Sequence, residues 1–233
     1  MANLSGAERA RYVQNMFSRI AGRYDLMNRL MTAGQDRSWR REVIQCLALP
    51  PQGGLLDLGA GTGDLAREAL EHYPGCRPVA ADFTLEMMLA GKQRPESARL
   101  RWLGADALRL PFPDETFDAA VSGFLFRNVS DIAQALAEQR RVLRPGGRIV
   151  ILDTTRPPRN WMTPLINIHF HTVIPTLGRL ITGEGEAYTY LPESTENFLH
   201  AEQLAERMLA AGFHQVGFRR RMLATIAIHW GTK

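Results

Sequence analysis

The sequence is poor in cysteine, lacks a long hydrophobic run and carries little excess charge. Its two cysteines, Cys46 and Cys76, form no C-x-x-C pair, which indicates neither a zinc site nor a disulfide framework and makes a reduced cytoplasm the expected setting. No apolar run approaches the roughly 20 residues of a membrane span, and residues 1–11 lack the apolar core of a signal peptide. The net charge of +4 is too small to indicate nucleic-acid binding, although it is compatible with contact to an anionic membrane surface.

The chain of 233 residues is organised around a glycine-rich turn between an apolar run and a helical pattern. Residues 54–58 form the apolar run, residues 59–63 read Gly-Ala-Gly-Thr-Gly, and residues 64–72 show helical periodicity. We call residues 59–63 the glycine loop. This order predicts a strand, a tight turn and a helix, the unit that opens a doubly wound α/β sheet and binds its ligand beyond the strand ends.

The spacing of Gly59, Gly61 and Gly63 differs from the G-x-G-x-x-G of dinucleotide-binding loops. Asp64 follows the loop where that fold places pyrophosphate, and Asp57 precedes the loop. Two carboxylates repel phosphate but suit a ligand with an amine and a fixed positive charge. S-adenosylmethionine carries both, in its α-ammonium and sulfonium groups. The structural alternative is a tight turn followed by a helix that Asp64 caps.

Two further acids follow later apolar runs. Asp82 lies 19 residues beyond Gly63, at the end of the run 78–81, a spacing that fits an acid accepting hydrogen bonds from ribose hydroxyls. Asp106 and Ala107 follow the third predicted strand, where an aspartate can accept from the amino group of adenine. A surface turn is the alternative for Asp106. Together with the glycine loop, these acids indicate binding of S-adenosylmethionine.

Apolar runs and helical patterns alternate along the chain, which predicts a mostly parallel sheet with helices on its faces. The predicted strands span 54–58, 77–81, 99–103, 117–122 and 148–153, and the predicted helices between them span 64–72, 84–93 and 131–143. Residues 8–48 read as helices packed on the sheet edge, although Tyr24 could line a ligand pocket from above. Residues 213–219 and 222–229 read as a closing antiparallel hairpin.

Polar side chains among aromatic residues follow the fourth predicted strand. Arg127 and Asn128 lie at its carboxyl end, where such sheets place their chemistry, although an arginine can also simply staple a loop. An apolar insertion at about 160–200 either covers this site or is a plain packing helix. It carries His169 and His171, whose separation of two places them on different sides of a helix, so we expect no metal site.

These segments together resemble the ubiquinone/menaquinone biosynthesis C-methyltransferases, which use S-adenosylmethionine. The resemblance runs from about Val13 to Gly231, and the glycine loop alone marks only the broad class. The segments that carry it are Tyr24-Asp25-Leu26-Met27-Asn28 with its continuation to 31, then 56–64, 82–87, 110–114 and 127–131. The first of these segments, and the last one, which begins Arg127-Asn128-Val129, narrow the resemblance from the broad class to this family.

The resemblance implies an α/β fold, a Rossmann-like seven-stranded doubly wound sheet with N-terminal helices and a helical insertion after the fifth strand. We therefore divide the chain into an N-terminal helical cap, residues 1–50, and an S-adenosylmethionine-binding domain, residues 51–233. The cofactor contacts implied by the resemblance and the loop chemistry are Tyr24, Asp57, Gly59, Gly61, Thr62, Gly63, Asp82, Phe83, Met87, Asp106, Ala107 and Gly123.

Two positions depart from the family pattern. Gly123 stands where the family usually has a serine near the cofactor, and Ser122 should point to the opposite face of its strand. Asp153 replaces the usual glutamate after the fifth strand and is shorter by one methylene. These changes could shift the substrate preference.

The implied reaction is methylation of a ring carbon on a polyprenylated quinol, demethylmenaquinol to menaquinol or a ubiquinone step. The carbon gains electron density when a quinol hydroxyl loses its proton. We therefore predict that Arg127 stabilises the phenolate, that Asn128 orients a hydroxyl, and that His169 or His171 takes the proton.

The protein should be cytoplasmic, with membrane-surface contact. The benzoquinol or naphthoquinol ring, the tail length and the oligomeric state stay open, a homodimer included. Two rival functions are methylation of a soluble small molecule and a non-catalytic role in assembling a quinone-synthesising complex. A dinucleotide oxidoreductase is disfavoured by the glycine spacing.

Overall fold

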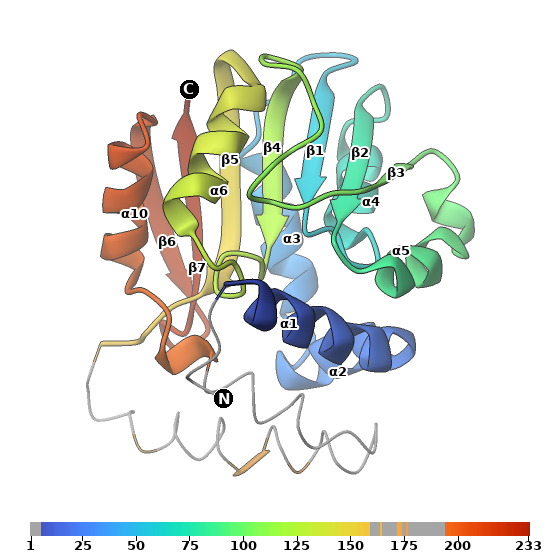
Figure 1. The fold of residues 1–233 in the computed structure, drawn as a ribbon, viewed down its shortest axis with the longest axis vertical. Coiled ribbons are helices and arrows are strands. Elements are labelled where there is room, and N and C mark those ends of the chain that lie inside the picture. The colour runs from blue at the N-terminus through green and yellow to red at the C-terminus, as the bar shows by residue number, and fades with distance from the viewer. Residues whose placement is uncertain (1–5, 159–163, 165–171, 174–175, 177–193) are drawn as a thin grey trace.

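The computed structural model describes residues 6–158, 164, 172–173, 176 and 194–233 of the chain. In this part the chain forms a seven-stranded sheet with the strand order β3-β2-β1-β4-β5-β7-β6. The first five strands along the chain pair in parallel, whereas β7 pairs antiparallel with both β5 and β6 (Figure 1). The predicted Rossmann-like doubly wound sheet is therefore confirmed.

The strands are β1 Gly54–Leu58, β2 Arg77–Asp82, β3 Arg101–Gly104, β4 Phe117–Gly123, β5 Leu143–Thr154, β6 His214–Arg221 and β7 Ile226–Thr232. The helices are α1 Gly6–Ile20, η1 Ala21–Arg23, α2 Tyr24–Met31, α3 Asp36–Gln45, α4 Asp64–His72, α5 Leu85–Lys92, η2 Pro95–Ser97, α6 Ile132–Val142 and α10 Ala201–Ala210. The predicted strands and the closing hairpin are present. Strand β1 has the predicted ends, and the ends of the other strands are shifted. The largest shift is in β5, which begins five positions before the predicted 148.

The central strands are apolar because helices cover both faces of the sheet. On the face of α6 and α10, Leu56 of β1 packs in one cluster with Leu136 and Leu204. On the opposite face, Leu55 packs with Ile44 of α3 and with residues of α4. Neighbouring residues of a strand face opposite layers, so burial of both layers requires near-continuous apolar runs.

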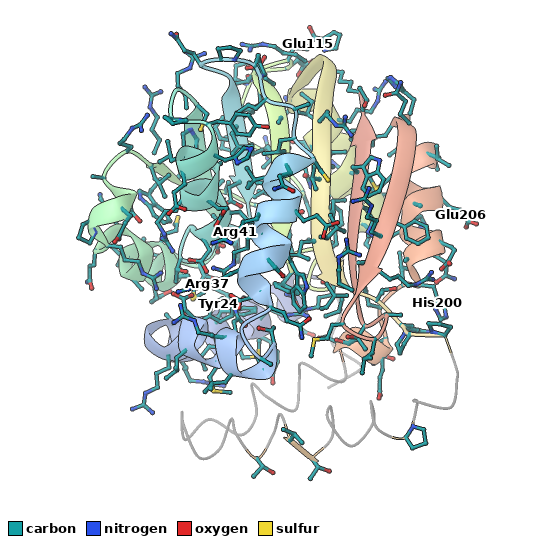
Figure 2. The ribbon with its side chains drawn as sticks, turned by 180° about the vertical axis from the view of Figure 1, so that it is seen from behind. Tyr24, Arg37, Arg41, Glu115, His200 and Glu206 are labelled. Atoms are coloured by element: carbon teal, nitrogen blue, oxygen red, sulfur yellow. The ribbon has the colours of Figure 1, made fainter. Side chains whose placement is uncertain are left out.

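The first three helices do not share the sheet-edge position expected for them. Helix α3 lies over one face of the sheet, as the view from behind shows (Figure 2). Helices α1 and α2 lie across the carboxyl ends of the parallel strands instead (Figure 1). Met16 and Ile20 of α1 pack on Met27 of α2 in a small core of their own. We call α1, η1 and α2 the cap helices.

No helix in the described ranges is long and apolar enough to cross a membrane. The two histidines proposed from the sequence, His169 and His171, lie outside the described residues, as does most of the predicted insertion at about 160–200.

Gly91 of α5 packs directly against the glycine loop. A Cβ added at Gly91 would lie within 3 Å of the Thr62 carbonyl oxygen and of the Trp102 ring. We expect Gly91→Ala to lower the free energy of unfolding by about 1–3 kcal/mol through overpacking, despite the better helix propensity of alanine. Gly104→Ala is the matched control, because an added Cβ there meets nothing within 4 Å. Urea denaturation would contradict this expectation if both variants unfold at the same midpoint.

Candidate active site

The glycine loop leaves β1 and enters α4 through three left-handed residues. The φ angles of Gly59, Gly61 and Gly63 are +69°, +56° and +83°. A Cβ at Gly63 would lie 2.7 Å from the Trp102 ring, and one at Gly59 would lie 2.9 Å from the Leu125 side chain. Backbone conformation and close packing therefore both require glycine at these positions.

The Asp82 carboxylate ties the glycine loop to the end of β2. Its Oδ2 accepts a hydrogen bond from the Gly61 N–H at 2.7 Å, and its Oδ1 accepts one from the Thr84 N–H, also at 2.7 Å. Burial raises the pKa of Asp82, while the backbone hydrogen bonds lower it. A carboxylate has about four acceptor positions, so Asp82 keeps capacity for a ligand hydroxyl.

A cavity of about 500 Å³ lies where the cap helices meet the carboxyl ends of the strands. Helix α1 contributes Val13, Gln14 and Phe17 to its lining. Of the residues predicted from the sequence, the cavity brings together Tyr24, Gly59, Gly61, Asp82, Phe83, Met87, Asp106, Ala107, Gly123 and Asn128. Figure 2 shows Tyr24 at the end of the molecule that carries the cap helices.

The Asp106 side chain stands in an exposed turn at the cavity. Its Oδ1 accepts a hydrogen bond from the Leu108 N–H at 2.9 Å, a local bond typical of an aspartate-initiated turn. Ala107 is buried beside it and lines the cavity with Leu108. The turn that was the alternative reading of Asp106 is thus present, and it places the aspartate at the cavity.

Three predicted cofactor residues, Asp57, Thr62 and Gly63, are absent from the cavity lining. The Asp57 carboxylate is buried and its Oδ2 accepts a hydrogen bond from the Ala66 N–H at 2.9 Å, which joins β1 to α4. The Thr62 hydroxyl donates to Asp25 Oδ1 of α2 at 3.0 Å. These residues therefore stabilise the glycine loop from the side that faces away from the cavity.

Asp64 is also turned away from the cavity, contrary to the expectation that its charge faces the ligand. Its carboxylate forms ion pairs with Arg40 and Arg67, and Arg94 lies 3.5 Å from its Oδ1. These partners could not be predicted from the sequence, because Arg40 and Arg94 are far from Asp64 along the chain. The charge of Asp64 is balanced within the protein.

Arg127 is buried next to the cavity-lining Asn128. Its side chain is 6% exposed, and the side-chain Nε lies 4.0 Å from Asp153 Oδ1. The backbone N–H of Arg127 donates to Asp153 Oδ2 at 3.2 Å. The guanidinium carbon lies 5.0 Å from the centroid of the Phe124 ring. Burial raises the pKa of Asp153, and the charge of Arg127 opposes this rise. Asn128 Nδ2 donates to the Phe124 carbonyl oxygen at 3.0 Å.

Gly123 and Ser122 lie on opposite faces of β4, as strand alternation predicts. Gly123 lines the cavity, whereas the Ser122 side chain is fully buried away from it. A Cβ at Gly123 would lie 3.2 Å from Leu65 Cδ1, so a serine here would need Leu65 to shift. Ser122 therefore does not replace the serine usual in the family.

The residues present fit S-adenosylmethionine. Asp82 and Asp106 offer carboxylate oxygens to hydroxyl and amino donors, and Phe83, Met87 and Ala107 offer apolar surface to an aromatic base. Glycines in the loop allow a ligand to approach the backbone closely. The cavity volume falls within the range of roughly 300–1,000 Å³ typical of small-molecule sites.

Comparisons with known proteins agree with this arrangement. A family model described as the ubiE/COQ5 methyltransferase family matches residues 5–233. The ubiquinone/menaquinone biosynthesis C-methyltransferase UbiE of Desulfotalea psychrophila is 47% identical over 221 residues, which cover 95% of this chain and 90% of that protein. The demethylmenaquinone methyltransferase of Thermus thermophilus is 44% identical over 220 residues, covering 94% and 100%.

A solved structure of an SAM-dependent methyltransferase from Aquifex aeolicus has the same fold. It superimposes with a TM-score of 0.60 at 18% identity, covering 83% of this chain and 88% of that one.

The buried Asp57 predicts a specific pH dependence of stability. Burial raises the pKa of its carboxyl to about 7, although the Ala66 N–H lowers it. The folded protein then binds a proton more tightly than the unfolded chain, so this contribution to stability falls as pH rises from about 4 to about 7. Asp57→Asn removes the titration. Relative to the wild type, the variant should gain about 2–3 kcal/mol in unfolding free energy between pH 5 and pH 8.

Denaturant unfolding at both pH values measures this difference. Parallel pH profiles for the two proteins would show that Asp57 does not titrate in this range.

Proposed function

Because the chain belongs to the ubiE/COQ5 methyltransferase family, we propose that the cavity under the cap helices is its active site and that a polyprenylated quinol is the methyl acceptor there. The protein is an S-adenosylmethionine-dependent C-methyltransferase of quinone biosynthesis. The observation that carries the proposal is the lining of one cavity by Asp82, Asp106 and Asn128, from the ends of three different strands.

The cofactor would be held on the side of the cavity formed by the glycine loop and the end of β2. Asp82 accepts from ribose hydroxyls, and Asp106 accepts from the adenine amino group. Phe83, Met87 and Ala107, which line the cavity, would pack on the base. When bound, S-adenosylmethionine supplies an electrophilic methyl group. Asp57, Thr62 and Gly63 keep the loop in shape, while Gly59, Gly61, Gly123 and Tyr24 complete the wall.

The catalytic assignments concern the segment that follows β4. Asn128 faces the cavity and orients a quinol hydroxyl. Arg127, held beside Asp153, stabilises the negative charge of the deprotonated quinol. It acts over a distance, because the protein interior screens the interaction between two charges less than water does. His169 of the insertion accepts the hydroxyl proton.

Contact with a membrane surface follows from the proposed acceptor, whose polyprenyl tail partitions into lipid. Phe83 lines the cavity and is 48% exposed, and Leu85 and Leu89 of α5 are 56% and 50% exposed. Exposed large apolar side chains that follow a cavity-lining residue along the chain are typical of surfaces that meet lipid or protein. They support peripheral binding at the membrane, where the acceptor resides.

The acceptor is tested with methyl-labelled S-adenosylmethionine and two reduced quinols, a demethylmenaquinol and a methoxy-polyprenyl benzoquinol. Label in either ring supports the proposal and identifies the ring, and label in both indicates a dual role. Label in neither, with calorimetric cofactor binding intact, would instead favour a soluble acceptor or a non-catalytic assembly role.

Arg127→Ala should lower turnover about 100-fold, because removing a group that stabilises developing charge typically costs that much. Cofactor affinity should change less than about threefold, since Arg127 is absent from the cavity lining. Arg109→Ala, which removes an exposed arginine near the Asp106 turn, is the matched control and should keep its turnover. Near-normal turnover in Arg127→Ala would refute the assignment.

Asp82→Ala should weaken S-adenosylhomocysteine binding at least tenfold, about 1.4 kcal/mol, because it removes a ligand acceptor and the bond to Gly61. Asp82→Asn keeps one acceptor oxygen and should bind with intermediate affinity. Titration calorimetry measures both, and an unchanged affinity in Asp82→Ala would exclude the ribose role.

A further inference from the structure

Four side-chain hydrogen bonds, among the contacts between described residues, join the cap helices to the rest of the protein near the cavity. Two of them are exposed: Gln14 Nε2 donates to the Phe83 carbonyl oxygen at 2.9 Å, and Ser18 Oγ donates to Glu86 Oε2 at 2.7 Å. The other two are partly buried and both end on Asp25 of α2.

Asp25 uses its two carboxylate oxygens for two different segments. Its Oδ1 accepts from the Thr62 hydroxyl at 3.0 Å, and its Oδ2 forms a hydrogen-bonded ion pair with Arg94, which follows α5. Thr62 stands between Gly61 and Gly63 in the glycine loop. Asp25 is therefore the cap residue that holds the middle of the loop.

The same bond belongs to a longer chain of alternating charges. Arg94 also approaches Asp64 at 3.5 Å, Asp64 pairs with Arg40, and Arg40 Nη2 lies 2.8 Å from Asp36 Oδ2. Removing one member of such a partly buried series takes a counter-charge from each of its neighbours, which is costly. The network thus fixes the position of α2 relative to the start of α4.

We propose that Asp25 is a positioning residue for cofactor binding. It acts through the Thr62 hydroxyl, which restrains the glycine loop in the conformation in which Gly59 and Gly61 line the cavity. Glycines gain many conformations when such a restraint is lost, so a smaller fraction of molecules is competent to bind and the apparent affinity falls. Because such coupling is reciprocal, a bound cofactor should in turn stabilise the arrangement in which Asp25 of the cap helices is bonded to Thr62. This inference rests on the cavity being the cofactor site.

The test is calorimetric titration of S-adenosylhomocysteine into Asp25→Ala, Asp25→Asn and Thr62→Val, with steady-state kinetics on the quinol that the wild type methylates. Asp25→Ala should raise Kd, and KM for S-adenosylmethionine, at least tenfold, with kcat changed less than about threefold. Asp25→Asn keeps an acceptor for Thr62 but loses the charge facing Arg94, so its Kd should be intermediate.

A double variant separates the proposed link from two independent effects. Asp25→Ala with Thr62→Val should bind no more weakly than Asp25→Ala alone, because both changes remove the same hydrogen bond. Additive losses in the double variant would overturn the proposed route through Thr62. If Asp25→Ala does not fold, Asp25→Asn and Thr62→Val decide the question, and wild-type affinity in both overturns the proposal.

Glu42→Gln is the matched control for a purely structural effect. The Glu42 side chain is 16% exposed, against 21% for Asp25, and it pairs with Arg221 at 2.6 Å, away from the glycine loop. It should lower Tm without changing Kd. An Asp25→Ala protein that loses Tm in the same way but keeps wild-type Kd would overturn the positioning role. Lack of binding by the wild type itself would instead refute the cavity as the cofactor site.

Discussion

The glycine loop depends on bonds from its surroundings, because Gly59, Gly61 and Gly63 have little intrinsic preference for the left-handed conformations they adopt. The Gly59 N–H and the Gly61 N–H donate to the Ala81 carbonyl and the Asp82 carboxylate, both at the end of β2. The pairing of β1 with β2 thus sets the loop conformation. The rest of the site, the cavity and the start of α4, follows from the position of this loop.

The acids around the loop have different tasks although they look alike in the sequence. Asp57 is buried against α4, and Asp64 is enclosed by arginines. Only Asp82 and Asp106, among the four acids from which the cofactor was inferred, line the cavity. Two of these carboxylates are therefore available to a ligand in the cavity, while the other two make contacts within the protein.

The order of strands and helices could be predicted because it depends on local patterns. Apolar runs, their spacing and the glycines at 59–63 identify the central strands, since each is buried on both faces. The placement of α1 and α2 across the strand ends could not be predicted, because it depends on contacts with α5 and on the Asp25–Arg94 pair. Helical periodicity shows which side of a helix is buried but not which partner buries it.

For the site itself, positions after strand ends were found because parallel strands bring their carboxyl ends together. Asp82, Asp106, Gly123 and Asn128 reach one cavity in this way. The directions of the Thr62 and Asp64 side chains could not be predicted. Thr62 lies in the glycine loop and its hydroxyl points to Asp25 of α2, whereas Asp64, which follows the loop, points to arginines.

Hydrogen–deuterium exchange with and without saturating S-adenosylhomocysteine tests the location of the active site most directly. We expect slower exchange in the cap helices, in the glycine loop and in the segments 82–87, 105–108 and 123–130, which together surround the cavity. Unchanged exchange in these segments, with protection confined to the opposite end of the sheet such as residues 144–148, would contradict the central claim that this cavity holds the cofactor.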